Sequence, residues 1–117
     1  MLTFIEYPKC STCRKAKAEL NQLGLDFEDV DIVKETPTAD QLLNWMEGSD
    51  FEVKSFFNTS GIKYRELGLK DKVPSMTAQE AADLLATDGM LIKRPLLVKD
   101  GKLIQIGYRK EYAELGL

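Results

Sequence analysis

The sequence predicts an α/β protein with one mixed β-sheet and a helical middle segment. Three patterns support this: residues 1–33 follow a strand, helix, strand order, residues 34–89 carry only helical patterns, and residues 90–117 return to strands. A chain of 117 residues can build one hydrophobic core without disulfides or metals. We therefore expect a single domain over residues 1–117, with a helical insertion between its two sheet-forming parts.

The first part reads as a βαβ unit. Residues 2–7 are rich in β-branched and aromatic side chains, and Pro8 ends this strand because proline has no N–H to donate. From residue 11 to residue 23 apolar side chains recur at helical spacing, and Gly24 follows as a stop signal. Residues 25–33 form the second strand. A strand, helix and strand within about thirty residues predict two parallel strands joined by a right-handed crossover.

The middle segment carries several helix start signals. Thr38 is a candidate N-cap, and Thr77 and Glu80 have the spacing of a capping box. Shorter helical stretches are predicted at residues 53–57 and 62–67. We expect this segment to contain no strand.

The last part predicts a β-hairpin followed by a helix. The strand-like residues 96–98 and 103–106 flank the sequence Asp100-Gly101, which favours the positive φ angles of a type I′ turn. Residues 108–115 have apolar side chains at helical spacing, so we expect a closing helix there.

Charge and hydropathy exclude several classes of function. Sixteen Lys and Arg residues against nineteen Asp and Glu leave a net charge of −3, so no overall positive field attracts nucleic acid or an anionic membrane. Charged Glu6 and Lys9 interrupt the first residues, and no later stretch approaches the length of a membrane span. We expect a soluble cytoplasmic protein that binds neither nucleic acid directly nor a membrane.

The two cysteines, Cys10 and Cys13, lie where the first strand passes into the first helix. In a reducing cytosol this pair indicates redox chemistry or metal binding more than a structural disulfide. A structural zinc site needs four nitrogen or sulfur ligands, and the chain has no histidine. We therefore expect no metal site. The missing histidine also excludes a Cys-His dyad.

Cys10 is the candidate nucleophile. A sulfur at a helix N-terminus meets unpaired backbone N–H groups and the positive end of the helix dipole, and Arg14 adds a charge one turn later. A free thiol with a pKa of about 8.5 is only about 3% thiolate at pH 7, whereas a pKa of about 6.5 makes it mostly thiolate. The N–H groups at Ser11 and Thr12 also suit a bound oxyanion.

Cys13 and Arg94 each leave two interpretations open. Cys13 lies one turn after Cys10, as a resolving thiol would, but it also shares the apolar stripe of Ala16 and therefore fits a small buried hydrophobe. Arg94 precedes Pro95, whose peptide bond can turn the chain sharply if it is cis. An arginine there can donate two hydrogen bonds to an oxyanion. Taken alone, an exposed charge before a strand is the commoner explanation.

Three stretches together resemble the ArsC/Spx family, the arsenate-reductase branch of the thioredoxin-like fold. They are residues 7–14, 64–69 and 91–96. The resemblance covers nearly the whole chain. It implies a thioredoxin-like, glutaredoxin-type sheet of four mixed strands, formed by residues 1–33 and 90–117, in a single ArsC/Spx-like domain. It also implies that Cys10 is the catalytic cysteine, that Arg94 binds an oxyanion, and that Pro95 is cis.

The function implied by the resemblance is an arsenate reductase or thiol-disulfide oxidoreductase without a bound cofactor. Its substrate would be a small oxyanion or a disulfide, and glutathione, glutaredoxin or thioredoxin would supply electrons. ArsC-type enzymes that use glutaredoxin carry two further arginines in the site. This chain has Asn58 at the first position, and Gly107 and Tyr108 near the second with Arg109 slightly offset, which predicts weaker oxyanion binding.

The second cysteine is similar to that of Spx, a transcriptional regulator that senses oxidation through a CxxC pair and binds RNA polymerase. In that alternative the oxidised pair changes a surface that contacts the polymerase α subunit, and no substrate is turned over. The sequence leaves the reductase and the regulator open.

Overall fold

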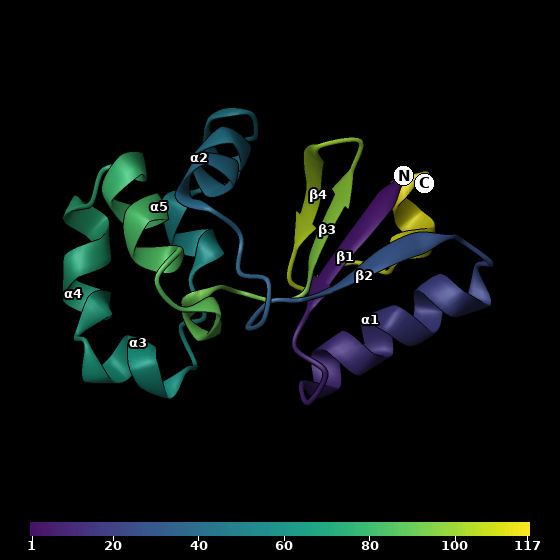
Figure 1. Ribbon diagram of the computed structural model, residues 1–117, viewed down its shortest axis with the longest axis horizontal. Helices are drawn as coiled ribbons and strands as arrows, with labels where there is room; N and C mark the ends of the chain where they lie inside the picture. The colour runs from purple at the N-terminus through teal and green to yellow at the C-terminus, as the bar shows by residue number, and fades with distance from the viewer. The chain divides into compact units, whose positions relative to one another are not determined.

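The computed structural model describes all residues from Met1 to Leu117. The chain divides into two compact units, a sheet unit formed by Met1–Asp31 and Arg94–Leu117 and a helical unit formed by Ile32–Lys93 (Figure 1). All four strands and both cysteines belong to the sheet unit. The candidate site therefore lies within that unit.

The sheet has the strand order β2-β1-β3-β4. Its strands are β1 (Leu2–Glu6), β2 (Phe27–Asp31), β3 (Leu96–Lys99) and β4 (Lys102–Ile106). β1 pairs in parallel with β2 and antiparallel with β3, and β3 pairs antiparallel with β4. The mixed four-stranded sheet is confirmed, as is its thioredoxin-like class. The hairpin turn adopts the expected conformation, because Asp100 and Gly101 have φ angles of 50° and 83°.

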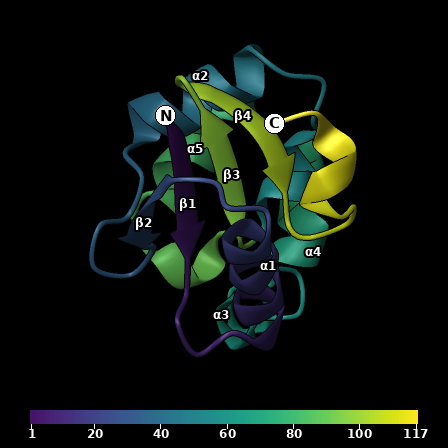
Figure 2. The ribbon, with the colours of Figure 1, turned by 90° about the vertical axis from the view of Figure 1, so that its right-hand side faces the viewer.

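Helix α1 (Ser11–Gln22) covers one face of the sheet. Its buried stripe is formed by Cys13, Ala16 and Leu20, all with no solvent exposure. Figures 1 and 2 show the C-terminal segment on the same face of the sheet as α1. One core cluster joins these parts; it consists of Leu2, Phe4, Ala16, Leu20, Leu97 and Tyr112. The start of α1 is thus fixed against a packed core.

The predicted closing helix over residues 108–115 is wrong in its first half. Only a short 3-10 turn, η4 (Tyr112–Leu115), is helical. The side chain of Gln105 accepts a hydrogen bond from the Lys110 N–H at 2.8 Å and donates one to the Lys110 carbonyl at 3.2 Å. These bonds close a loop around Gly107, whose φ of 71° does not fit a right-handed helix. A side chain has replaced the backbone partners that a helix would have used.

The helical unit contains four α-helices and three 3-10 turns. They are α2 (Ala39–Glu47), η1 (Val53–Phe56), α3 (Ile62–Glu66), α4 (Leu69–Lys72), η2 (Val73–Ser75), α5 (Ala78–Leu85) and η3 (Gly89–Leu91). Both predicted N-caps are present, since Thr38 and Thr77 each take part in a capping box. The sequence did not reveal α4, because a helix of four residues is too short to show a period. No helix is long and apolar enough to cross a membrane.

Candidate active site

The backbone around Cys10 places its sulfur at the start of α1. The Cys10 N–H donates to the Tyr7 carbonyl at 2.9 Å, and the Cys10 carbonyl accepts the Arg14 N–H at 3.1 Å, which begins the helix. Cys10 is thus the N-cap residue, with extended backbone angles and a half-buried side chain. That side chain makes no cap hydrogen bond of ordinary geometry. Its sulfur therefore remains available beside the positive end of the helix dipole.

The environment of Cys10 favours the thiolate. Partial burial acts to raise the pKa of Cys10, but several neighbouring groups outweigh it. The backbone N–H and the thiol of Cys13 act as donors toward the Cys10 sulfur, and Arg94 contributes both its charge and a hydrogen bond. The result is a pKa of Cys10 below the ordinary thiol value. The arrangement therefore acts in favour of the ionised form of Cys10, with no imidazole involved.

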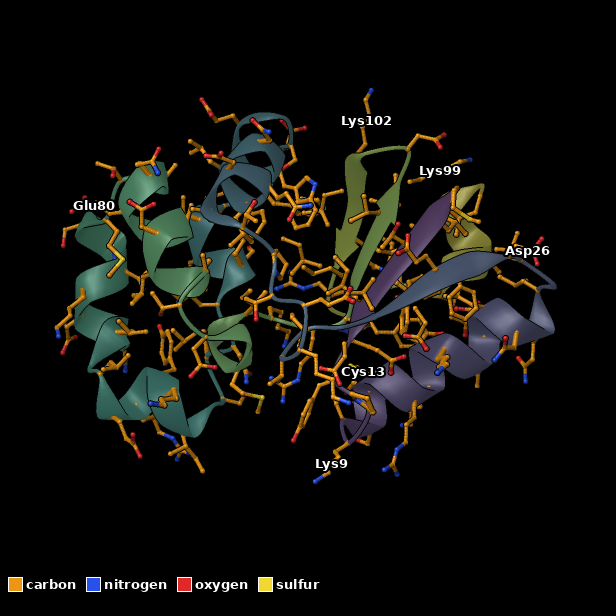
Figure 3. The ribbon with its side chains drawn as sticks, in the orientation of Figure 1. Lys9, Cys13, Asp26, Glu80, Lys99 and Lys102 are labelled. Atoms are coloured by element: carbon orange, nitrogen blue, oxygen red, sulfur yellow. The ribbon has the colours of Figure 1, made fainter.

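Cys13 occupies a very different environment from Cys10. Its side chain has no solvent exposure, and it lies at the first turn of α1 (Figure 3). Burial and the neighbouring Cys10 together raise the pKa of Cys13 to about 12, although the backbone of Tyr7 and the charge of Arg94 act in the opposite direction. Both cysteines are free thiols in this structure. Cys13 is therefore buried as a hydrophobe would be, and it is also a direct neighbour of Cys10.

Arg94 provides the positive charge of the site. It stands at the start of the sheet unit's second segment, joined to Pro95 by a cis peptide bond. Its guanidinium carbon lies 5.1 Å from the centroid of the Tyr7 ring, within the range of a cation–π interaction. The Arg94 Nε and Nη1 atoms are buried and have no hydrogen-bond partner. Unpartnered donors beside a reactive sulfur suit an anionic substrate group.

The structure brings Cys10, Cys13 and Arg94 together but gives Arg14 a different contact. The Arg14 Nε donates to the Pro8 carbonyl at 3.2 Å and so supports the cysteine loop, while its side chain is exposed. Ser11 and Thr12, at the first two positions of α1, are exposed as well. Lys9, in the same loop, extends away from the protein in Figure 3.

An acidic cluster behind the cysteine loop was missed at the level of sequence. The side chain of Glu6 is only 4% exposed, although it belongs to a strand whose other buried residues are apolar. Lys17 Nζ lies 3.3 Å from a Glu6 oxygen and 2.5 Å from an Asp29 oxygen, so one lysine bridges two carboxylates. Burial, together with the hydrogen bond and charge of Asp29, raises the pKa of Glu6 to about 7. The alternation of strand residues could have predicted this burial, because Glu6 points to the same face of the sheet as Leu2 and Phe4, and α1 covers that face.

We expect the Glu6→Gln variant to lose much of the pH dependence of stability. Because the folded-state pKa of Glu6 is raised from 4.5 to about 7, the native state binds more protons between these values, and stability falls as pH rises through about 7. Asp29, whose pKa is lowered, acts only at more acidic pH. Urea unfolding between about pH 5 and pH 8 should show a loss of about 2 kcal/mol in the wild type. A variant whose stability falls as steeply as that of the wild type would contradict this assignment.

Comparison with known proteins places the chain and its fold in a family. The chain has a thioredoxin-like α/β sheet, a cysteine at the start of its first helix and an Arg-Pro pair before its hairpin. The ArsC family profile matches residues 5–114, and the chain belongs to the ArsC family.

Relatives of two kinds are found. The crystal structure of a possible arsenate reductase from Streptococcus mutans UA159 matches this structure with a TM-score of 0.97. The two sequences are 62% identical, and the match covers 100% of this chain and 98% of that chain. The uncharacterized protein YusI of Bacillus subtilis is 47% identical over 97% of this chain and 95% of its own length. The global transcriptional regulator Spx of Streptococcus pyogenes is 26% identical, covering 95% of this chain and 81% of its own length. The family thus includes both reductase-like proteins and regulators.

Proposed function

We propose that this protein is a cytoplasmic thiol-dependent reductase in which Cys10 is the nucleophile and Cys13 the resolving thiol. The observation that carries the proposal is the Cys10 environment. A half-buried sulfur with a lowered pKa lies next to a second thiol and to an arginine with unused donors. Such a site activates one thiol and keeps the other protonated until it is needed.

The proposed reaction with a disulfide substrate has two steps. The Cys10 thiolate attacks one sulfur of the substrate, a mixed disulfide forms, and the other substrate sulfur leaves as a thiolate. Cys13 then loses its proton to solvent and attacks the Cys10 sulfur, which forms the Cys10–Cys13 disulfide and releases the second thiolate. The substrate has gained two electrons. Glutathione, glutaredoxin or thioredoxin reduces the protein disulfide by the same exchange and closes the cycle.

A small oxyanion such as arsenate is the second substrate class that we propose. The Arg94 donors and the N–H groups of Ser11 and Thr12 would hold its oxygens. The Cys10 thiolate would bond to arsenic while one As–OH bond breaks, and the hydroxyl would leave as water with a proton from solvent. Attack of Cys13 or glutathione on the Cys10 sulfur would then release arsenite and transfer two electrons to arsenic. The similarity to the Streptococcus mutans protein supports this class. Asn58 and Tyr108, in place of two arginines, favour weak binding.

Mild peroxide treatment tests the resolving role of Cys13. We expect intact-mass spectrometry to show the loss of two hydrogens, because Cys10 oxidises to a sulfenic acid and Cys13 condenses with it. The Cys13→Ser variant should instead retain a sulfenic acid or glutathione adduct on Cys10. If the wild type gave only intermolecular disulfides or glutathione adducts, Cys13 would not be the resolving thiol.

A redox-sensing regulator is the second candidate, and the similarity to Spx favours it. In this case the same Cys10–Cys13 disulfide would alter a surface that binds the RNA polymerase α subunit. The purified protein with arsenate, glutathione, glutaredoxin and coupled NADPH oxidation separates the two functions. Turnover supports the reductase. No turnover, together with copurification of the polymerase α subunit, supports the regulator.

A further inference from the structure

The charged end of Arg94 lies over the ring of Tyr7. The guanidinium carbon is 5.1 Å from the ring centroid. The Arg94 Nε and Nη1 atoms are buried and make no hydrogen bond, so neither of them donates to a carboxylate. A carboxylate would hold the arginine in place, but it would also neutralise the charge and occupy the donors. An aromatic face attracts the charge and leaves both donors unused.

The register of the sheet brings these two residues together. β1 and β3 lie side by side and antiparallel (Figure 2), and the last pair of their register is Ile5 opposite Leu96. Tyr7 lies two residues beyond this pair on one chain segment, and Arg94 lies two residues beyond it on the other. Because antiparallel partners run in opposite directions, the same register continued places Tyr7 opposite Arg94. The contact therefore follows from the pairing of two strands of the sheet.

Tyr7 also contacts the cysteine loop through its backbone. Its carbonyl accepts the Cys10 N–H at 2.9 Å, in the turn that precedes α1. One residue thus contacts two members of the site, Arg94 through its ring and Cys10 through its carbonyl. Although burial acts to raise the pKa of Cys10, the charge and a hydrogen bond of Arg94 are among the causes that lower it.

We propose that Tyr7 is a positioning residue whose ring holds the Arg94 guanidinium beside the Cys10 sulfur. The inference rests on the proposed function, in which Arg94 supports the Cys10 thiolate and donates to an anionic substrate. An arginine side chain has several rotatable bonds, so ordering it at the moment of reaction costs entropy. A contact that orders the side chain beforehand removes this cost, and the contact with Tyr7 does so without reducing the charge.

The test is a double-mutant cycle on the reactivity of Cys10. Iodoacetamide labelling is followed across pH in a Cys13→Ser parent, so that only Cys10 can react. In the Tyr7→Leu variant of this parent we expect labelling near pH 7 to slow about threefold. The pH midpoint of labelling should rise, whereas the limiting rate at high pH should not fall. In the Arg94→Met background the same Tyr7→Leu change should have no further effect, because the ring has no charge to hold.

Two further variants separate the ring contact from general packing. Tyr7→Phe keeps the aromatic face and should label at close to the rate of the parent. Phe27→Leu removes a ring whose centroid lies 5.8 Å from that of Phe4, and Phe27 pairs with the first residue of β1, at the end far from the cysteine loop. This variant should lower the free energy of unfolding in urea but leave the pH profile of Cys10 labelling unchanged.

The inference is overturned if Tyr7→Leu labels as fast as its parent, or if it slows labelling by the same factor with and without Arg94. It is also overturned if Arg94→Met has no effect, or if Tyr7→Phe slows labelling as much as Tyr7→Leu does. In all of these cases fast labelling of Cys10 in the parent still supports the reductase. If the parent itself labels like an ordinary free cysteine, there is no activated thiolate, and the proposed function and this inference fail together.

Discussion

Replacing Arg94 by methionine is expected to raise the pKa of Cys10. Methionine keeps an unbranched apolar stem but lacks the charge and the hydrogen bond that lower this pKa. Burial of the sulfur, which raises the pKa, is then opposed only by the hydrogen-bond donors of Cys13. The rate of iodoacetamide labelling near pH 7 should fall about tenfold or more, because labelling follows the thiolate fraction. The full pH profile of labelling, measured in the Cys13→Ser background, gives the pKa directly.

Arg14→Met is the matched control for this experiment. Arg14 is closer to Cys10 in sequence, but its Nε is engaged by the Pro8 carbonyl and the charge that acts on Cys10 is that of Arg94. The control should leave the pKa of Cys10 nearly unchanged. If Arg14→Met raised the pKa as much as Arg94→Met, the general charge of the region and not the placement of Arg94 would explain the thiolate. Arg94→Lys retains the charge but not the planar pair of donors, so it should restore only part of the effect.

The strands and their connections were predictable because their signals are local. The Asp100-Gly101 turn and the capping residues Thr38 and Thr77 each determine backbone structure within a few residues. The parallel pairing of the first two strands follows from the length and handedness of the crossover.

The composition of the site depends on contacts between distant parts of the chain. Ile5 lies opposite Leu96 in the antiparallel pair of β1 and β3, and this register brings Arg94 beside the loop that follows β1. No periodicity in the sequence encodes that neighbour. The resemblance to a known family, and not the local pattern, suggested a site role for Arg94. The closing helix was wrongly predicted for a similar reason. The side chains of Gln105 and Glu19 accept hydrogen bonds from backbone N–H groups that a helix would have paired locally.

A reductase and a redox-sensing regulator both require the same chemical properties of the two cysteines. Each needs one ionised sulfur that meets the oxidant or substrate and one thiol that stays protonated until the first has reacted. The opposite pKa shifts of Cys10 and Cys13 provide this difference. The two functions therefore differ in the partner that binds the oxidised protein. Variants of the two cysteines alone do not distinguish the functions.

The Cys10→Ser variant should make the folded protein almost inert toward alkylation, although one cysteine remains. With a pKa of about 12, Cys13 is ionised in only about one molecule in a hundred thousand near pH 7, and its side chain has no solvent exposure. Removing Cys10 lifts its unfavourable effect on Cys13 ionisation but leaves burial, the larger cause. We expect iodoacetamide labelling to slow by at least about a thousandfold relative to the wild type.

Labelling of the same variant in urea provides the control, because the unfolded Cys13 thiol should react at the rate of an ordinary cysteine. The opposite variant, Cys13→Ser, should label at nearly the wild-type rate in the folded state, since the backbone N–H of residue 13 and Arg94 still act on Cys10. Fast labelling of folded Cys10→Ser would mean that Cys13 is reached by solvent in ordinary fluctuations. In that case burial would not keep Cys13 protonated, and the division of roles between the two thiols would be lost.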